Sequence, residues 1–122
     1  DGQVWLETDI VSGKMTHDRY TPEGIYAVYN KERNRHLRGE QRPDLSYEYD
    51  VLVDYWIPFN QAIGIHDAYW QSSYGGTNFI RGGSRGCINP PYNAVSQIYE
   101  WVKVGTPVVC YYSGDLNSLF ID

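Results

Sequence analysis

The sequence has 122 residues, a mass of 14.1 kDa and a formal net charge of −5, and 42% of its residues are hydrophobic. These values predict a single folded domain over residues 1–122 and argue against disorder. The acidic balance excludes the basic surface that binds phosphate backbones, so we expect no nucleic-acid partner. No apolar run approaches the ~20 residues of a membrane span, so we expect no span in this chain.

The chain begins at Asp1 with neither Met nor a leader, so we expect either a fragment of a longer protein or a mature domain, with any targeting signal outside the given sequence. Its two cysteines, Cys87 and Cys110, allow one disulfide at most, and two free thiols are the favoured alternative. The paired Cys or His spacing typical of zinc sites does not occur, so we expect neither a metal nor another cofactor.

The first half of the chain favours strands separated by polar turns. Residues 4–11 hold Val, Trp, Thr and Ile, which favour sheets. After a turn at 21–24, residues 25–29 are expected to form a second strand. Residues 31–43 are polar and irregular, with an excess of positive charge. Within them, residues 31–42 form either a solvated charged loop, which is the favoured alternative, or a hairpin that covers the functional site of the domain.

The second half predicts two more strands, a glycine-rich loop and one helix. Strands are expected at residues 47–59 and 63–66, and a loop at 75–86. Asn89 and the two prolines after it resemble a helix start, with Asn89 as the cap. An apolar stripe with helical spacing follows, formed by Val95, Ile98, Tyr99 and Val102.

Gly105 marks the expected end of this helix, and residues 108–112 are expected to form a last strand. The elements together predict a mainly β fold, either a β-sandwich or a curled mixed sheet, with one helix packed against it. Cys110 lies inside the last strand and fits a core position. Cys87 does not, because its neighbours are typical loop residues.

Cys87 is the candidate nucleophile. A cysteine attacks as the thiolate, and the expected helix start just beyond Cys87 favours negative charge there. Gly86 allows a tight turn, so its N–H and that of Cys87 could converge on one oxygen as an oxyanion hole. His66 ends an expected strand and is the candidate general base, in preference to His17 and His36 in polar, loop-like segments.

A histidine and a Ser-Arg-Gly-Cys run lie at a defined spacing, with His66 preceding Cys87 by 21 positions. Thr-Pro-Glu-Gly-Ile-Tyr at 21–26 and Gly-Thr-Pro-Val-Val at 105–109 accompany them. Together these segments resemble the YkuD-type L,D-transpeptidase catalytic domain over nearly the whole chain. Residues 54–59, followed by residues 64–67, resemble the Gram-positive branch in particular.

The resemblance implies an enzyme that acts on peptidoglycan stem peptides. Cys87 would attack the carbonyl of the third residue, a diamino acid, and His66 would act as base and then as acid while D-alanine leaves. Gly86 and Cys87 would form the oxyanion hole, and Ser84 or a main-chain carbonyl would orient His66. An amine would take the acyl group to give a 3→3 cross-link, or water would take it, as in an L,D-carboxypeptidase.

The resemblance also implies binding residues, an inhibitor class and a location. The substrate groove is expected to include Asn89, and either Trp70, Tyr69 and Tyr74 also line it or these three form an aromatic cluster on a surface loop. Arg85 stands where many members have His, and it either binds a substrate carboxylate or is a solvated loop charge. Carbapenem-type β-lactams are expected to acylate the nucleophile. The implied location is extracellular, at the cell wall, reached through an upstream membrane anchor or secretion signal.

Other classes fit less well. Papain-like cysteine peptidases place Cys before His, and sortases carry a catalytic Arg after Cys, whereas no Arg follows Cys87 here. A catalytically degenerate cell-wall binding module is the non-enzymatic alternative. The intact set of His66, Ser84, Gly86 and Cys87 argues against it.

Overall fold

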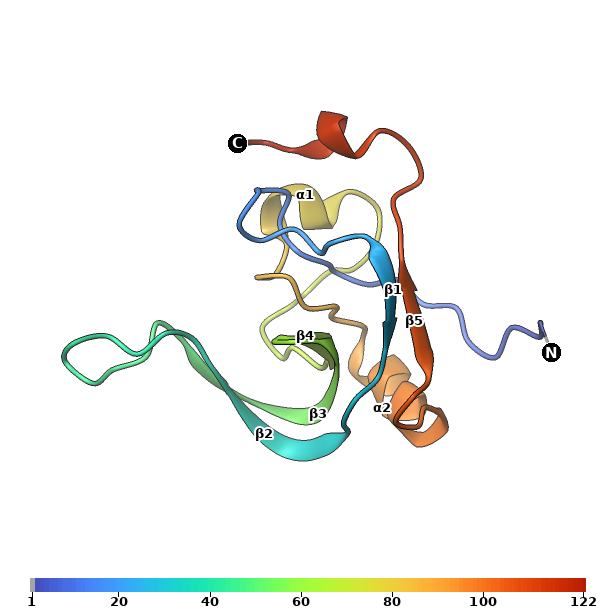
Figure 1. The fold of residues 1–122 in the computed structure, drawn as a ribbon, viewed down its shortest axis with the longest axis horizontal. Helices are drawn as coiled ribbons and strands as arrows, with labels where there is room; N and C mark the ends of the chain where they lie inside the picture. Colours follow the sequence, from blue (N-terminus) through green and yellow to red (C-terminus); the bar gives the residue numbers. More distant parts are fainter. Residues whose placement is uncertain (1) are drawn as a thin grey trace.

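Two small antiparallel sheets form the β structure of this chain, whose computed structural model describes residues 2–122 (Figure 1). The strands are β1 (Gly24–Ala27), β2 (Glu32–Arg38), β3 (Asp50–Asn60), β4 (Ile63–His66) and β5 (Pro107–Cys110). β1 pairs with β5, and β2, β3 and β4 lie in that order in the other sheet. The predicted mainly β fold is confirmed. Four predicted strands, at 25–29, 47–59, 63–66 and 108–112, occur within about three residues of their predicted ends.

One helix packs against the sheets, as predicted. α2 (Tyr92–Trp101) places Val95 in the core with Val28 and Ile57, and each of these is at most 1% exposed. Burial of an aliphatic side chain of this size stabilises the fold by about 1.5–3 kcal/mol. The rest of the predicted stripe packs around this core, namely Ile98, Tyr99 and Val102. Two short helices fall outside the prediction, α1 (Asn78–Gly82) within the glycine-rich segment and the 3-10 helix η1 (Leu116–Leu119).

The predicted strand at residues 4–11 is wrong. Val11 alone makes a β-bridge, to Asn89, and Val4 and Trp5 are 68% and 70% exposed. In Figure 1 the N-terminal end of this segment lies apart from both sheets. Strand-forming residue types need a neighbouring strand to pair with, and none of the described strands pairs with residues 4–10.

The expectation of an irregular segment at residues 31–43 is also wrong, because these residues contain β2. This strand pairs with β3 and places Arg38 opposite Asp50. Charged side chains suit an edge strand, because their charged ends face solvent while their aliphatic parts cover neighbouring aromatic rings. The guanidinium of Arg33, for example, lies 4.3 Å from the centre of the Tyr55 ring. The β2–β3 hairpin extends away from the rest of the fold (Figure 1).

Asn89 does not cap α2, and Gly105 does not end it. The helix begins at Tyr92 without a side-chain cap and ends at Trp101. Asn89 is fully buried, so its side chain lies inside the protein instead of at the helix end. Gly105 forms the turn that leads into β5, with a φ of +99° that glycine adopts at little cost.

Strand β4 brings the segment of the candidate nucleophile next to the candidate base. A tight turn at Gln61, with φ +51°, leads from β3 into β4. The free edge of β4 then pairs in parallel with the chain beyond the glycine-rich loop. His66 N donates to Ile88 O over 3.0 Å, and Ile88 N donates to Gly64 O over 2.9 Å. This pairing gives the sheet its mixed character and fixes His66 beside the segment of Cys87.

Gly13 supports the other side of that segment. It forms a parallel bridge with Ser84, and its N–H donates to Thr21 Oγ1 over 2.9 Å. A Cβ at Gly13 would lie 2.0 Å from the Arg19 carbonyl oxygen, so Gly13→Ala must displace the main chain.

We expect the Gly13→Ala variant to lose about 2–4 kcal/mol of unfolding free energy in a urea titration. Gly82→Ala, which adds a methyl in open space, is the control, and equal losses would contradict the prediction.

Candidate active site

A cavity of about 660 Å³ is bordered by the β2–β3 hairpin and by the loops that follow β4 and α1. This volume lies in the range of small-ligand sites. Cys87 and His66 both line it. The other predicted site residues that line it are Ser84, Arg85, Asn89, Tyr69 and Trp70. Gly86 and Tyr74 are not among the lining residues.

The Cys87 thiol is held as a neutral hydrogen-bond donor. Its Sγ donates to Ala62 O over 3.5 Å. Burial raises the pKa of the thiol to about 11, and a hydrogen bond from the Gly64 N–H lowers it by less. α2 begins only at Tyr92, and the field of a helix end acts within about one turn. The predicted stabilisation of a thiolate by the helix start is therefore wrong.

His66 is 4% exposed, and both nitrogens of its ring are engaged. Nδ1 lies 2.6 Å from Asp67 O, which can only accept, so Nδ1 carries the proton. Nε2 is then an acceptor, and Asn89 Nδ2 donates to it over 3.2 Å. Burial lowers the pKa of His66 despite opposing effects from Asp67, so the ring is neutral at pH 7. Within the described residues, no hydrogen bond joins this ring to the Cys87 thiol.

Asn89 lies against the base, although the sequence placed it only near the substrate groove. Its Nδ2 also reaches the His66 carbonyl at 3.5 Å, while its Oδ1 has no partner among residues 2–122. A buried, unpaired amide oxygen costs free energy. Half a turn of the amide would exchange Oδ1 and Nδ2. Asn89 can therefore donate to the neutral ring or accept an N–H from the protonated ring.

Ser84 shapes the turn that carries Cys87, the candidate nucleophile. Its Oγ donates to Cys87 O over 2.6 Å and accepts from the Gly86 N–H over 3.1 Å. Gly86 has a φ of +128°, which strongly favours glycine. Thr21 Oγ1 donates to the Gly86 carbonyl over 2.7 Å and holds the same turn. Ser84 thus contacts the main chain around the nucleophile, while the Asp67 carbonyl orients His66.

Arg85 joins the segment of the nucleophile to the β2–β3 hairpin. Its guanidinium forms an ion pair with Glu48 and lies 4.9 Å from the centre of the Tyr49 ring. Side chains of β2 also wall the cavity, namely Arg35, His36 and Arg38. The structure therefore has a hairpin beside the site, and the favoured expectation of a solvated charged loop at residues 31–42 is wrong.

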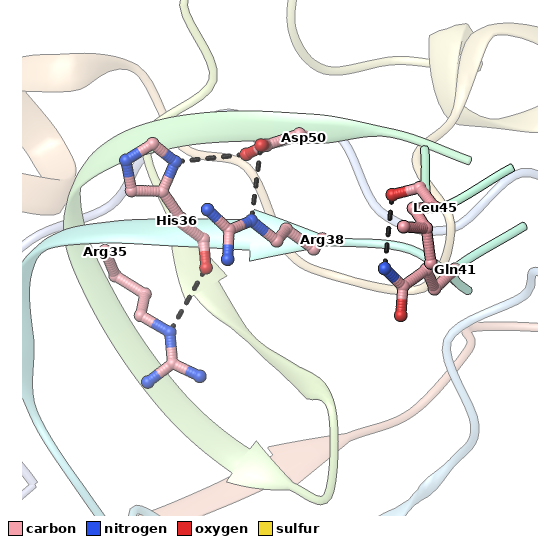
Figure 2. A network of polar contacts seen from close by, with 6 residues as sticks. All are labelled: Arg35, His36, Arg38, Gln41, Leu45 and Asp50. Atoms are coloured by element: carbon pink, nitrogen blue, oxygen red, sulfur yellow. Dashed lines mark hydrogen bonds and ion pairs between the residues drawn. The ribbon is translucent and has the colours of Figure 1, made fainter. Parts of the chain in front are cut away.

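The polar groups of β2 are bound to the hairpin itself. Figure 2 shows His36 and Arg38 both bound to Asp50 on β3, at 3.0 and 3.2 Å. Hydrogen bonds from these two side chains lower the pKa of Asp50. His17, the other competing histidine, does not line the cavity and pairs with Asp122 at 2.8 Å.

Three acceptors complete the site, and of these the sequence anticipated only a main-chain carbonyl for His66, without saying which one. The Asp67 carboxylate, in a residue 6% exposed, accepts the main-chain N–H groups of Asp54 (3.1 Å) and Tyr55 (2.8 Å). These bonds fix the chain directly after His66 to β3. The carbonyls of Asp67 and Ala62 bind the base and the thiol, and a main-chain carbonyl has no signature in a sequence. The one available signal is an acidic residue immediately after the candidate base.

Neither a metal cluster nor a membrane-spanning helix occurs in the described part of the chain. No three His, Cys, Asp or Glu side chains gather there as a metal ion would require. No helix of residues 2–122 is long and apolar enough to cross a bilayer. Cys87 and Cys110 are both free thiols, which was the favoured alternative.

Comparison with known proteins identifies a family. A family model described as the YkuD L,D-transpeptidase catalytic domain matches residues 1–110 of this chain. A comparison with curated proteins gives no match.

Solved structures share the fold. A crystal structure of an Enterococcus faecium L,D-transpeptidase, in a cysteine-to-serine variant, is 41% identical and covers 91% of this chain and 43% of that one, with a TM-score of 0.79. The E. faecium catalytic domain acylated by ertapenem is 43% identical to this chain, with a TM-score of 0.74. The match covers 91% of this chain and 84% of that domain. An L,D-transpeptidase from Mycobacterium smegmatis is 25% identical, with a TM-score of 0.74. The match covers 89% of this chain and 50% of that one. This chain thus spans less than half of the first structure.

Proposed function

Because this chain belongs to the YkuD family of L,D-transpeptidase catalytic domains, we propose that it catalyses acyl transfer between peptidoglycan stem peptides with Cys87 as nucleophile. The observation that supports this best is the presence of Cys87 and His66 in one cavity, with Nδ1 of His66 bound to a carbonyl. Nε2 is then the nitrogen that can take the thiol proton.

In the first step, Cys87 attacks the carbonyl carbon of the third stem residue, a diamino acid. The thiol turns from the Ala62 carbonyl toward His66, and Nε2 takes its proton as the S–C bond forms. The tetrahedral intermediate then collapses and the C–N bond to D-alanine breaks. His66 returns the proton to the departing amine, and a thioester on Cys87 remains.

The chain's own groups support the charges of this step. Asn89 leaves Nε2 as the thiol approaches, and its Oδ1 can then accept the N–H of the imidazolium. The Cys87 N–H is the first oxyanion donor, since no described residue accepts from it. The Gly86 N–H donates to Ser84 Oγ in the resting site, so it becomes the second donor only when that hydroxyl turns away.

In the second step an acceptor attacks the thioester. A side-chain amine of another stem, or of a residue attached to it, gives a 3→3 cross-link and regenerates the Cys87 thiol. Water gives an L,D-carboxypeptidase, which is the second candidate function. A binding module without turnover is a weaker candidate, because the site keeps a nucleophile and an oriented base.

The substrate implies the partners and the location. Peptidoglycan stems lie outside the cytoplasmic membrane, so we place the domain there, at the cell wall. The route through an upstream anchor or secretion signal belongs to the same proposal.

A mass spectrum of the products formed from disaccharide-tetrapeptide tests the proposed function. A cross-linked dimer that lacks one D-alanine supports transpeptidation. A monomer that only loses D-alanine supports the carboxypeptidase. An unchanged substrate contradicts both and favours the binding module.

Carbapenem acylation is expected at Cys87 and not at Cys110. The β-lactam carbonyl fits the same nucleophile, and an ertapenem adduct is known for the E. faecium relative. Cys110 lies on β5 outside the cavity, and burial raises the pKa of its thiol. Peptide mapping after incubation with ertapenem should place the added mass on Cys87. The Cys110→Ala variant should still be acylated fully at Cys87. Added mass on Cys110 of the wild-type chain would contradict the prediction.

A further inference from the structure

The cavity concentrates positive charge in an acidic chain. Its lining includes four arginines, which are Arg19, Arg35, Arg38 and Arg85, and no aspartate or glutamate. The chain as a whole carries a net charge of −5. This distribution favours an anionic ligand, because a cleft lined by one sign of charge focuses the field on its contents.

Three of these arginines already have carboxylate partners. Arg35 pairs with Glu32 at 2.8 Å. Arg38 pairs with Asp50 at 3.2 Å (Figure 2). Arg85 pairs with Glu48. Their guanidinium charges are therefore partly compensated within the hairpin.

Arg19 differs from the other three. No carboxylate of residues 2–122 lies within ion-pair distance of its side chain, which is half-buried at the cavity wall. A guanidinium offers a planar pair of N–H donors that matches a carboxylate. The neighbouring, exposed Asp18 carboxylate acts on Arg19 electrostatically but forms no ion pair with it, so the N–H donors of this half-buried guanidinium suit an anion from the ligand.

The position of Arg19 specifies which carboxylate it can meet. A Cβ built on Gly86 would lie 3.6 Å from the Arg19 carbonyl oxygen, so the main chain of Arg19 lies beside the residue that precedes Cys87, and Arg19 lines the same cavity as Cys87. Thr21, two residues on, holds the same Gly86 carbonyl at 2.7 Å. In a tetrapeptide stem, the terminal carboxylate is one residue beyond the carbonyl that Cys87 attacks. An arginine next to the nucleophile therefore suits the leaving residue.

We propose that Arg19 binds the terminal carboxylate of the donor peptide and so selects stems that end one residue after the attacked carbonyl. This assignment rests on the proposed function for the identity of the peptide. Selection by a carboxylate partner restricts the donor to a free C-terminus, because a longer stem places an amide there.

Peptide binding to the Cys87→Ala chain tests the assignment without turnover. Disaccharide-tetrapeptide and its terminal carboxamide are titrated by NMR against this variant, alone and combined with Arg19→Gln. Arg19→Gln is expected to raise the Kd of the carboxylate peptide about tenfold, as for a charge-assisted hydrogen bond. The Kd of the carboxamide should stay within about twofold. Arg81→Gln removes the same charge outside this cavity and should change neither Kd.

An equal effect of Arg19→Gln on both peptides would overturn the assignment, because the guanidinium would then meet another group. Binding of neither peptide to Cys87→Ala would overturn it as well. The proposed function is tested separately by release of D-alanine from the wild-type chain. Turnover without carboxylate preference would overturn only the role of Arg19. Carboxylate preference without turnover would overturn only the proposed function.

Discussion

Cys87→Ala is expected to lose acyl transfer by about 10⁴-fold or more, since no other group of the cavity can form the thioester. The cavity holds one cysteine, and the other thiol of the chain, Cys110, lies outside it. Stability should change little, because the change removes one partly buried sulfur and its weak bond to Ala62. The rate is measured as D-alanine released from disaccharide-tetrapeptide, and folding is checked by urea unfolding.

Cys110→Ala is the matched control for this experiment. It removes a free thiol of similar burial from β5 and should keep the wild-type rate. Residual D-alanine release by Cys87→Ala above about 1% of the wild-type rate would contradict the assignment of the nucleophile. Equal losses in both variants would point to a folding effect.

His66→Gln is expected to slow acylation of Cys87 by about 10²–10⁴-fold, as for the loss of a general base. In the wild-type chain the rate should fall at acidic pH, because a protonated imidazole cannot take the thiol proton. Burial lowers the pKa of His66 below 6.5, so the fall should lie below that pH and the rate should be level at neutral pH. The measurement is the pH dependence of acylation by ertapenem.

The variant should have a different pH profile. Without a base, attack needs the thiolate, and the thiol pKa is about 11. The rate of His66→Gln should therefore rise about tenfold per pH unit through the neutral range. His17→Gln removes a histidine outside the cavity and should keep the wild-type profile. An acidic limb that persists unchanged in His66→Gln would mean that another group is the base.

Sequence reasoning predicted those elements whose apolar pattern also forms the core. The stripe through Val95 in α2 and the strand at 63–66 are of this kind, and both are observed. The errors at residues 4–11 and in β2 have one physical cause. Residue types indicate whether a segment can be a strand, but pairing depends on the neighbour that the tertiary fold supplies. Residues 4–10 have no such neighbour, whereas the charged β2 has β3.

The site was predictable where side-chain chemistry is distinctive. Cys87 and His66 were predicted as nucleophile and general base from residue type and spacing; both line one cavity, and their roles stay predictions. The contact of Asn89 with Nε2 of His66 spans 23 positions and depends on the parallel pairing beside β4. The carbonyl of Asp67 and the thiol's bond to Ala62 involve main-chain atoms. Neither kind of contact can be inferred from residue identities alone.

The neutral state of the Cys87 thiol also affects its survival. Peroxides oxidise the thiolate to sulfenic acid and beyond, whereas the protonated thiol reacts slowly. A pKa of about 11 in place of 9.0 leaves about a hundredfold less thiolate at neutral pH than an ordinary cysteine has. The sulfur is thus kept in its least oxidisable form between turnovers. In the proposed reaction it becomes nucleophilic only when a peptide carbonyl and His66 meet it together, which would protect this single cysteine from oxidation in the absence of substrate.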